Sequence, residues 1–229
     1  MPTDKRVLDI YAKQKSFGKV GPMRASGGWL VPIYFDVRTA LSQPKNLKAF
    51  ANIFAECIKK NGIKFDAIVG GATAGMPIAL ALAMKLNKPF LWVRKIPKKG
   101  GMGKAVEGYF EKGWKVLLVD DVIVNGTSKA PFIKNIRKAG LIVDTIMVTL
   151  RRPKIKSFSK IKNLKVKVYD FGSLDVLMEY MAAKNYITQE ALKIIKWYTE
   201  YPDTWHQDPK KMEFLNKYKK NKKNSISKI

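Results

Sequence analysis

The sequence is poor in the two residue types that most often build metal centres and catalytic dyads. Its 229 residues include one cysteine, Cys57, and one histidine, His206. A single cysteine cannot form a disulfide or a cysteine zinc site within one chain, and one histidine leaves little room for a histidine-based metal site or triad. Cys57 falls among the apolar residues of an expected helix, where a buried structural thiol is the better interpretation than a catalytic nucleophile.

Long apolar segments and acidic residues are also scarce. The longest apolar run, around residues 77–84, is too short to span a bilayer, and the polar start of the chain does not resemble a secretory signal. We therefore expect a cytoplasmic protein without membrane attachment. Lysine and arginine number 44 against 18 acidic residues, a net charge of +26.

This positive charge has two interpretations. One is nucleic-acid binding, and the other is a lysine-rich solvated surface that also serves anionic small substrates. The lysines are spread along the whole chain, and no recognisable nucleic-acid-binding module accompanies them. The second interpretation is therefore favoured, and nucleic acid is an unlikely partner.

Hydrophobic periodicity predicts alternating strands and helices. The expected helices cover residues 3–15, 44–61, about 76–86, 128–139, 174–183, 189–198 and 208–219. The expected strands cover residues 33–37, 65–69, 89–93, 116–119, 141–150 and 166–169. Such alternation is typical of an α/β fold, a parallel sheet flanked by helices. Thr3 and Thr188 are the expected caps of two of the helices.

Two adjacent carboxylates, Asp120 and Asp121, follow the strand predicted at 116–119. A pair of acids at the end of a buried strand is costly unless a ligand uses it. The hydroxyls of a ribose diol or a Mg²⁺-bound sugar phosphate are suitable ligands. Taken alone, the pair is equally well explained as a helix cap plus a solvated acid.

The residues directly after the acidic pair favour a phosphate site. In the segment Val124-Asn125-Gly126-Thr127-Ser128, the glycine permits a tight turn in which backbone N–H groups converge on an anion. The helix that begins here adds a favourable dipole, and two hydroxyls add donors. A monophosphate site beside a diol site fits a ribose 5-phosphate, and an ordinary strand-to-helix turn is the alternative.

Two further segments follow predicted strands. Gly71-Ala72-Thr73-Ala74-Gly75 consists of small residues that let a ligand approach the backbone, although a helix packed close to the sheet explains them equally well. Residues 94–104 carry Arg94, Lys95, Lys98 and three glycines. Such a basic loop can close over a polyanion, or it can simply be exposed and flexible. Parallel sheets bind ligands beyond the carboxyl ends of their strands, where all three segments lie.

The segment VLLVDDVIVNGTS, residues 116–128, resembles the phosphoribosyl pyrophosphate (PRPP) motif of type I phosphoribosyltransferases. The resemblance implies that Asp120 and Asp121 hold the ribose hydroxyls and that residues 124–128 hold the 5-phosphate. It also implies that Ala72, Thr73, Ala74 and Gly75 form the pyrophosphate loop, in which a non-proline cis peptide is frequent in the family. The expected metal is Mg²⁺, carried by PRPP and not bound directly by the protein.

The spacing further resembles the orotate phosphoribosyltransferase branch. The matching residues are Arg94, Lys95, Lys98, the pair Glu107-Gly108, and the early segment Tyr34-Phe35-Asp36-Val37-Arg38. The resemblance implies a catalytic role for Lys98 beside the acidic pair, and PRPP contacts from Arg94, Lys95 and Lys98. It implies base contacts from Arg24, Val124 and Arg152. It also implies a homodimer in which loop 94–104 reaches the neighbouring site.

The same resemblance divides the chain into an N-terminal helix and hood at residues 1–40 and a phosphoribosyltransferase core at 41–170. C-terminal helices follow at 171–219, and residues 220–229 are expected to form a disordered tail. Two departures concern the base. There is no histidine near Gly100 in the loop, and Val124 stands where a hydroxyl is usual. The predicted reaction is phosphoribosyl transfer from PRPP to orotate. A phosphoribosyltransferase for another base, such as a purine, and a PRPP-sensing regulator that binds nucleic acid are the alternatives.

Overall fold

The computed structural model describes residues 3–14, 18–24, 30–97, 103–124, 126–152, 161–201 and 204–220. The chain divides into two compact units. The larger one comprises residues 41–172 together with the first residues of the chain, and the smaller one comprises residues 4–40 and 173–229. The two units are described separately.

The larger unit is built on a six-stranded sheet with the strand order β5-β4-β3-β6-β7-β8. The strands are β3 (Ala67–Gly71), β4 (Phe90–Val93), β5 (Val106–Glu107), β6 (Lys115–Ile123), β7 (Ile142–Arg151) and β8 (Lys167–Asp170). The short β5 runs antiparallel to β4, and every other neighbouring pair is parallel. The predicted α/β fold with a parallel sheet flanked by helices is confirmed. The carboxyl ends of β3, β4 and β6 therefore meet at one edge.

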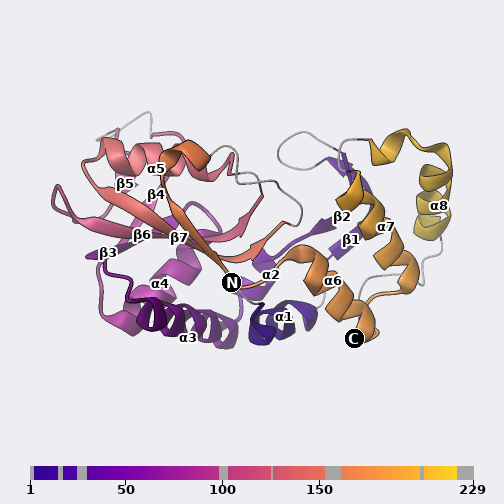
Figure 1. Cartoon of the computed structure of the whole chain (residues 1–229), viewed down its shortest axis with the longest axis horizontal. Helices are drawn as coiled ribbons and strands as arrows, with labels where there is room; N and C mark the ends of the chain where they lie inside the picture. Colours follow the sequence, from indigo (N-terminus) through magenta and orange to yellow (C-terminus); the bar gives the residue numbers. More distant parts are fainter. Residues whose placement is uncertain are drawn as a thin grey trace. The chain divides into compact units, whose positions relative to one another are not determined.

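Helices cover both faces of this sheet, with α3 and α4 on one side and α5 on the other (Figure 1). Their bounds are Pro44–Asn61 for α3, Gly75–Leu86 for α4 and Lys129–Lys138 for α5. Phe132, Ile133 and Ile136 of α5 pack on alternate residues of the strands in a fully buried cluster. This two-sided burial explains why the central strands are continuously apolar.

Helix α3 begins and ends where the sequence predicts. Pro44 occupies its first turn, where a missing N–H has no cost, and the helix ends at Asn61. Its apolar stripe, which includes Phe50 and Phe54, is buried, and the ring of Phe54 stacks on Phe171 at 4.6 Å between centroids. Cys57 lies on the same face, and burial raises the pKa of its thiol, so the structural interpretation of this cysteine is supported.

The smaller unit joins segments from the two ends of the sequence. It contains α1 (Lys5–Ala12), the antiparallel hairpin of β1 (Gly18–Arg24) and β2 (Leu30–Phe35), and the helices α6 (Leu174–Ala183), α7 (Gln189–Glu200) and α8 (Pro209–Lys220). Tyr180 donates its hydroxyl hydrogen to Asp9, and the buried Trp205 donates from Nε1 to the Leu30 carbonyl at 3.2 Å. These bonds tie the hairpin and α1 to the C-terminal helices.

Several boundaries differ from the sequence-based expectation, and the contacts explain three of the differences. Asp4, not Thr3, caps α1, because its carboxylate accepts the N–H of Arg6. The glycine-containing stretch from Gly18 to Arg24 forms β1, since pairing with β2 supplies hydrogen bonds that its own composition does not suggest. Strand β6 continues past Val119 to Ile123, because β7 remains paired with it up to Arg151. The acidic pair therefore lies inside the strand and not beyond its end.

The remaining short elements are α2 (Arg38–Leu41), the 3₁₀ turn η1 (Lys162–Leu164) and the 3₁₀ turn η2 (Trp205–Gln207). Thr188 caps α7 as predicted, because its hydroxyl accepts the N–H of Ala191 at 3.2 Å. Within the described part of the chain, every helix is too short or too polar to cross a membrane.

Candidate functional site

The three segments singled out in the sequence lie at one edge of the larger unit's sheet. Gly71 of β3 pairs in register with Val93 of β4, and Gly70 pairs with Val119 of β6. The N–H of Ala72 donates to the Val93 carbonyl at 2.9 Å, so the first two segments leave the sheet side by side. The ends of β3 and β4 thus bring the small-residue loop and the start of the basic loop to the level of the acidic pair in β6.

The small-residue loop packs directly on Asp120. Its Ala72–Thr73 peptide bond is cis, as the resemblance implies for a pyrophosphate loop. A Cβ atom at Gly75 would lie 2.5 Å from the Val119 carbonyl oxygen and 2.8 Å from Oδ1 of Asp120, and one at Gly71 would lie 2.9 Å from Oδ2. All three distances are shorter than real Cβ contacts, so glycine at these positions lets the loop touch the acidic pair.

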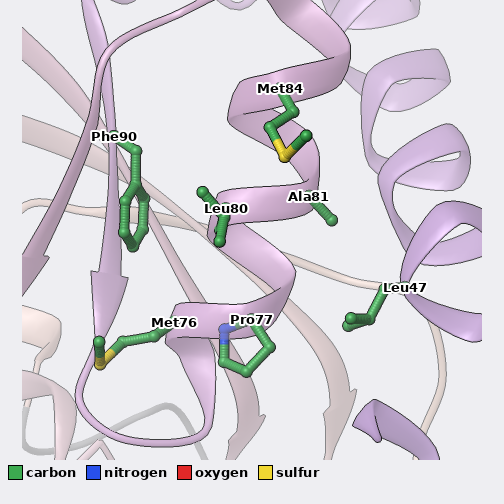
Figure 2. Close-up of a pocket in the computed structure, with 7 residues that line it drawn as sticks. All are labelled: Leu47, Met76, Pro77, Leu80, Ala81, Met84 and Phe90. Carbon is green, nitrogen blue, oxygen red and sulfur yellow. The ribbon is translucent and has the colours of Figure 1, made fainter. Parts of the chain in front are cut away.

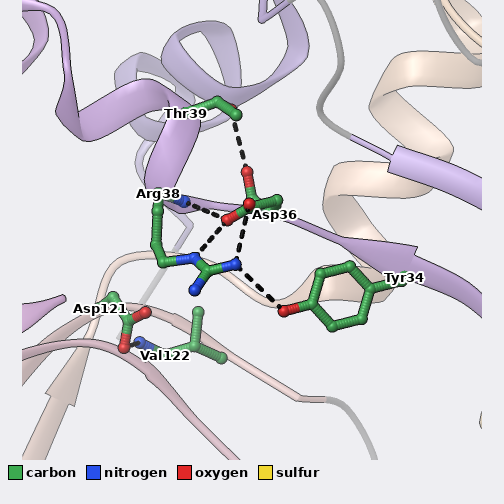
Figure 3. Close-up of polar contacts among 6 residues, drawn as sticks. All are labelled: Tyr34, Asp36, Arg38, Thr39, Asp121 and Val122. Carbon is green, nitrogen blue, oxygen red and sulfur yellow. Dashed lines mark hydrogen bonds and ion pairs between the residues drawn. The ribbon is translucent and has the colours of Figure 1, made fainter. Parts of the chain in front are cut away.

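The two adjacent carboxylates have different surroundings. The Asp120 side chain is 6% exposed, and its Oδ1 accepts the N–H of Asp121 at 2.9 Å while its Oδ2 accepts from Nζ of Lys129. The Asp121 side chain is 19% exposed, and its Oδ1 accepts the N–H of Val122 at 2.6 Å (Figure 3). Asp120 is therefore enclosed by protein, and Asp121 is the more accessible carboxylate of the pair.

The pKa of Asp121 also differs from that of an ordinary aspartate. Burial raises the pKa of its carboxyl from 3.8 to about 7, the neighbouring charge of Asp120 adds to that rise, and the Lys129 ammonium opposes it. The strand backbone holds the group in place, since the Asp121 carbonyl accepts a hydrogen bond from Oγ1 of Thr149 at 2.6 Å. The direction of the pKa shift favours the protonated carboxyl more than in an ordinary aspartate.

The turn that follows β6 leads directly into α5. Gly126 has φ of +85°, a left-handed conformation that favours glycine, and its carbonyl accepts the N–H groups of Lys129 and Ala130, each at 2.9 Å. Thr127 is exposed and Ser128 is partly exposed, so both hydroxyls border the turn. The positive end of the α5 dipole points at this turn, as an anion site requires. Asn125, predicted as a further phosphate contact, lies outside the described residues.

Lys129 is a site residue that the sequence interpretation missed. Its side chain is only 3% exposed, it pairs with Asp120, and its Nζ lies 4.0 Å from Oδ1 of Asp121. The motif was interpreted only as far as Ser128. A signal was present, because a cation in the first turn of a helix opposes the helix dipole and needs a nearby anion.

The basic segment is fixed at its root. The N–H of Arg94 donates to the Ala105 carbonyl at 2.9 Å, which brings the two ends of the segment together. Asn135 of α5 donates from Nδ2 to the carbonyls of Arg94 and Lys95 at 2.7 and 3.1 Å. The sequence does not indicate a role for Asn135, because its neighbours in the sequence form no recognisable motif. Residues 98–102, Lys98 among them, lie outside the described residues.

The residues expected on the base side are divided between the two units. Val124 directly follows β6, and Arg152 follows β7 with its N–H donating to the Ile123 carbonyl at 2.9 Å. These two residues therefore leave neighbouring strands of the larger unit at the same edge. Arg24 is exposed at the end of β1, in the smaller unit.

The early segment that matched the orotate branch forms a polar cluster in the smaller unit. Arg38 donates to Asp36 from Nε at 2.6 Å and from Nη2 at 2.9 Å, and Nη2 also lies 3.4 Å from the Tyr34 hydroxyl (Figure 3). Thr39 donates its hydroxyl to the Asp36 carbonyl at 2.9 Å. The hydrogen bonds from Arg38 lower the pKa of Asp36, so this cluster stays ionised at neutral pH.

Comparisons with known proteins agree on one family. The phosphoribosyl transferase domain matches residues 37–166. The orotate phosphoribosyltransferase of Lactococcus lactis is 31% identical over 193 residues, which cover 84% of this chain and 92% of that protein. The crystal structure of orotate phosphoribosyltransferase from Aeropyrum pernix has a TM-score of 0.64 and 26% identity, over 77% of this chain and 99% of that one.

A longer protein is also similar. The structure of Leishmania donovani UMP synthase has a TM-score of 0.71 and 26% identity, over 86% of this chain. The matched region is 41% of that protein, so this chain spans less than half of its length.

Proposed function

The chain belongs to the orotate phosphoribosyltransferases within the phosphoribosyl transferase domain family, and we propose that it transfers the phosphoribosyl group of PRPP to orotate. The products are orotidine 5'-phosphate and pyrophosphate. One observation carries the proposal: the turn before α5, the accessible carboxylate of Asp121 and the small-residue loop lie at one edge of the sheet. We assign them to the 5-phosphate, the ribose hydroxyls and the pyrophosphate of PRPP.

Each part of this edge has a task in the proposed complex. The turn at residues 126–128, at the α5 N-terminus, holds the 5-phosphate. Asp121 accepts hydrogen bonds from the ribose hydroxyls, and its exposure exceeds that of Asp120. The N–H groups of residues 73–75 and the small side chains of the loop face the pyrophosphate. Arg152, beside Val124, pairs with the orotate carboxylate. Arg24 stays a prediction from the sequence.

The reaction needs positioning and charge neutralisation, not a protein nucleophile. A ring nitrogen of orotate forms the new bond to the anomeric carbon of ribose while the bond to pyrophosphate breaks, through an oxocarbenium-like transition state. The same nitrogen loses its proton, which the departing pyrophosphate can accept. Negative charge accumulates on the departing pyrophosphate. Arg94 and Lys95 at the root of the basic loop, and Lys98 farther along it, supply positive charge to that group. Fixed donors in a site of this kind avoid the cost of reorienting water.

The acidic pair has little free capacity to hold a Mg²⁺ ion directly, because the ammonium group of Lys129 already pairs with it. Among the described residues, no group of three or more histidine, cysteine or acidic side chains is arranged to hold a metal. Both carboxylate oxygens of Asp120 already accept hydrogen bonds. The proposal is therefore that Mg²⁺ arrives bound to the phosphate oxygens of PRPP, where it neutralises part of their charge.

A steady-state assay of pyrophosphate release tests the proposed reaction. The purified protein is supplied with PRPP, Mg²⁺ and one base at a time from a panel of orotate, uracil, hypoxanthine, guanine and adenine. We expect turnover with orotate, and Lys98→Ala should lower kcat more than it raises the KM for orotate. Turnover with a purine and none with orotate would contradict the assignment of the base while leaving PRPP use intact.

We also propose that the chain forms a homodimer through an apolar groove on the larger unit. The groove has a volume of about 380 Å³ and is lined by Leu47, Met76, Pro77, Leu80, Ala81, Met84 and Phe90 (Figure 2). Leu80 is 44% exposed and Met84 is 76% exposed, which is unusual for side chains of this size.

Its position supports a second copy as the occupant. Helix α4, which supplies most of the lining, begins at the small-residue loop, and β4, which supplies Phe90, leads into the basic loop. A copy seated on this groove would lie beside the strand that leads into the basic loop, as a loop shared between neighbouring sites requires. Light scattering after size exclusion tests it. Leu80→Asp should give monomers, and the control Ile142→Asp, at an exposed residue of β7, should not. Dimers of Leu80→Asp would count against this interface.

A further inference from the structure

Lys129 is buried in a place that is unfavourable for a lysine. Its side chain is 3% exposed, although lysine is almost never fully buried without a partner. It also lies in the first turn of α5, where the helix dipole disfavours a positive charge. Burial and dipole both oppose its presence, so specific partners must hold the ammonium group there.

Those partners are the two carboxylates that the proposed function uses. The ammonium group makes an ion pair with Asp120 and lies 4.0 Å from Oδ1 of Asp121. Oδ1 of Asp120 accepts the N–H of Asp121 at 2.9 Å, and the carboxylate packs against Gly71 and Gly75. Lys129 thus completes the contacts that enclose the Asp120 carboxylate, and its positive charge also acts on Asp121.

The arrangement changes the net charge of the acidic pair. Two ionised carboxylates alone carry two negative charges and oppose the approach of a polyanion such as PRPP. They also form the hard oxygen ligand set that attracts Mg²⁺ or Mn²⁺. The ammonium group cancels one of the charges and occupies the space beside both carboxylates that such an ion needs.

We infer that Lys129 is the resident cation of the acidic pair, which neutralises and orients Asp120 so that the pair receives ribose hydroxyls without a protein-bound metal ion. Lys129 is then a positioning residue, since it acts on PRPP through Asp120 and Asp121. The expected effect of Lys129 on PRPP binding rests on the proposed function. The expected effect of Lys129 on metal binding does not, because it depends on the protein alone.

Binding of Mn²⁺ to the full chain, followed by electron paramagnetic resonance without PRPP or orotate, tests the inference. The wild-type protein should leave Mn²⁺ free in solution, and Lys129→Arg, which keeps the charge, should do the same. Lys129→Met should take up one Mn²⁺ ion per chain. The double variant Asp120→Asn/Lys129→Met, which removes both charges of the Asp120–Lys129 ion pair, should lose that ion again.

Steady-state kinetics give a second readout. In Lys129→Met the KM for PRPP should rise by about tenfold or more, because an uncompensated carboxylate then faces the substrate, while the KM for orotate should change by less than about twofold. Higher Mg²⁺ concentration should restore the KM for PRPP in this variant and not in the wild type. A change that only reflected a damaged fold would affect both substrates and would not respond to Mg²⁺.

Two results would overturn the inference. One is uptake of one Mn²⁺ ion per chain by the wild-type protein that Asp120→Asn abolishes, a measurement that needs no Lys129 variant to fold. The other is a folded Lys129→Met protein that binds no Mn²⁺ and keeps its KM for PRPP. Since the Mn²⁺ titration involves no base and no turnover, a failed orotate assay would refute the proposed function and leave this inference standing.

Discussion

Replacing Asp121 with asparagine should make the protein more stable and less active. Burial and the adjacent Asp120 raise the pKa of the Asp121 carboxyl to about 7, against 3.8 for an ordinary aspartate. Because a tenfold difference in proton affinity corresponds to about 1.4 kcal/mol, ionising this group in the folded protein costs on the order of 4 kcal/mol. An asparagine has no charge to bury, so the variant escapes most of that cost.

The sign of the pH dependence follows from the direction of this shift. Below pH 3.8 the carboxyl is protonated in both the folded and the unfolded protein, and it contributes no difference. As the pH rises, the unfolded chain releases the proton first, so the wild-type free energy of unfolding falls until the pH passes about 7. The advantage of Asp121→Asn should therefore be near zero around pH 4 and largest from pH 8 upward.

Urea denaturation of both proteins at intervals between pH 5 and pH 9 measures the effect. The control is Asp144→Asn, which removes an exposed carboxylate paired with Lys115 and should change stability by less than about 1 kcal/mol. In the activity assay, Asp121→Asn should raise the KM for PRPP by about 10- to 100-fold, the worth of a hydrogen bond to a charged group. A stability difference that is the same at pH 5 and pH 8 would refute the reasoning.

Two other substitutions test the packing around the site. Gly75→Ala puts a Cβ atom 2.5 Å from the Val119 carbonyl oxygen and should cost about 1–3 kcal/mol of stability and most of the affinity for PRPP. The control is Gly113→Ala, at φ +88° with no atom within 4 Å of its Cβ, which should lose about 1 kcal/mol of stability and keep the kinetics of the wild type. Equal kinetics in the two variants would contradict the contact between Gly75 and the acidic pair. Asn135→Leu removes both hydrogen bonds to the root of the basic loop and should lower kcat with little change in the KM for orotate. The exposed neighbour Lys134→Ala should leave kcat unchanged, and a loss of kcat there as well would show a general effect of α5.

The fold of the larger unit could be predicted from the sequence because its signals are local. Strands buried on both faces appear as continuous apolar runs, and α3 carries a proline at its start and an apolar stripe along one face. The smaller unit could not be predicted in the same way. Its hairpin depends on pairing between β1 and β2, and bonds such as the one from Trp205 to Leu30 join residues from opposite ends of the sequence.

The candidate site also has a part that could be predicted from the sequence and a part that could not. Its location follows from a rule of topology, since segments that end parallel strands meet at one edge, and the turn before α5 uses backbone atoms that neighbouring residues position. The difference in exposure between Asp120 and Asp121 follows no such rule. It arises because Gly71, Gly75 and Lys129 close around one carboxylate and leave the other partly exposed.

The charge of a site is therefore harder to predict than its shape. Along the sequence, Asp120 and Asp121 appear as two equal negative charges, and Lys129 appears as one of many surface lysines in a chain of net charge +26. Folding removes water from all three groups, and each then depends on the others, because Coulomb energies grow as the local dielectric constant falls. Burial thus separates this lysine from the other basic residues in the described part of the chain, which its sequence neighbours alone do not do. The same burial raises the pKa of Asp121 to about 7. The protonation of that carboxyl and the charge of the nearby Lys129 therefore both contribute to the net charge that PRPP encounters in the site.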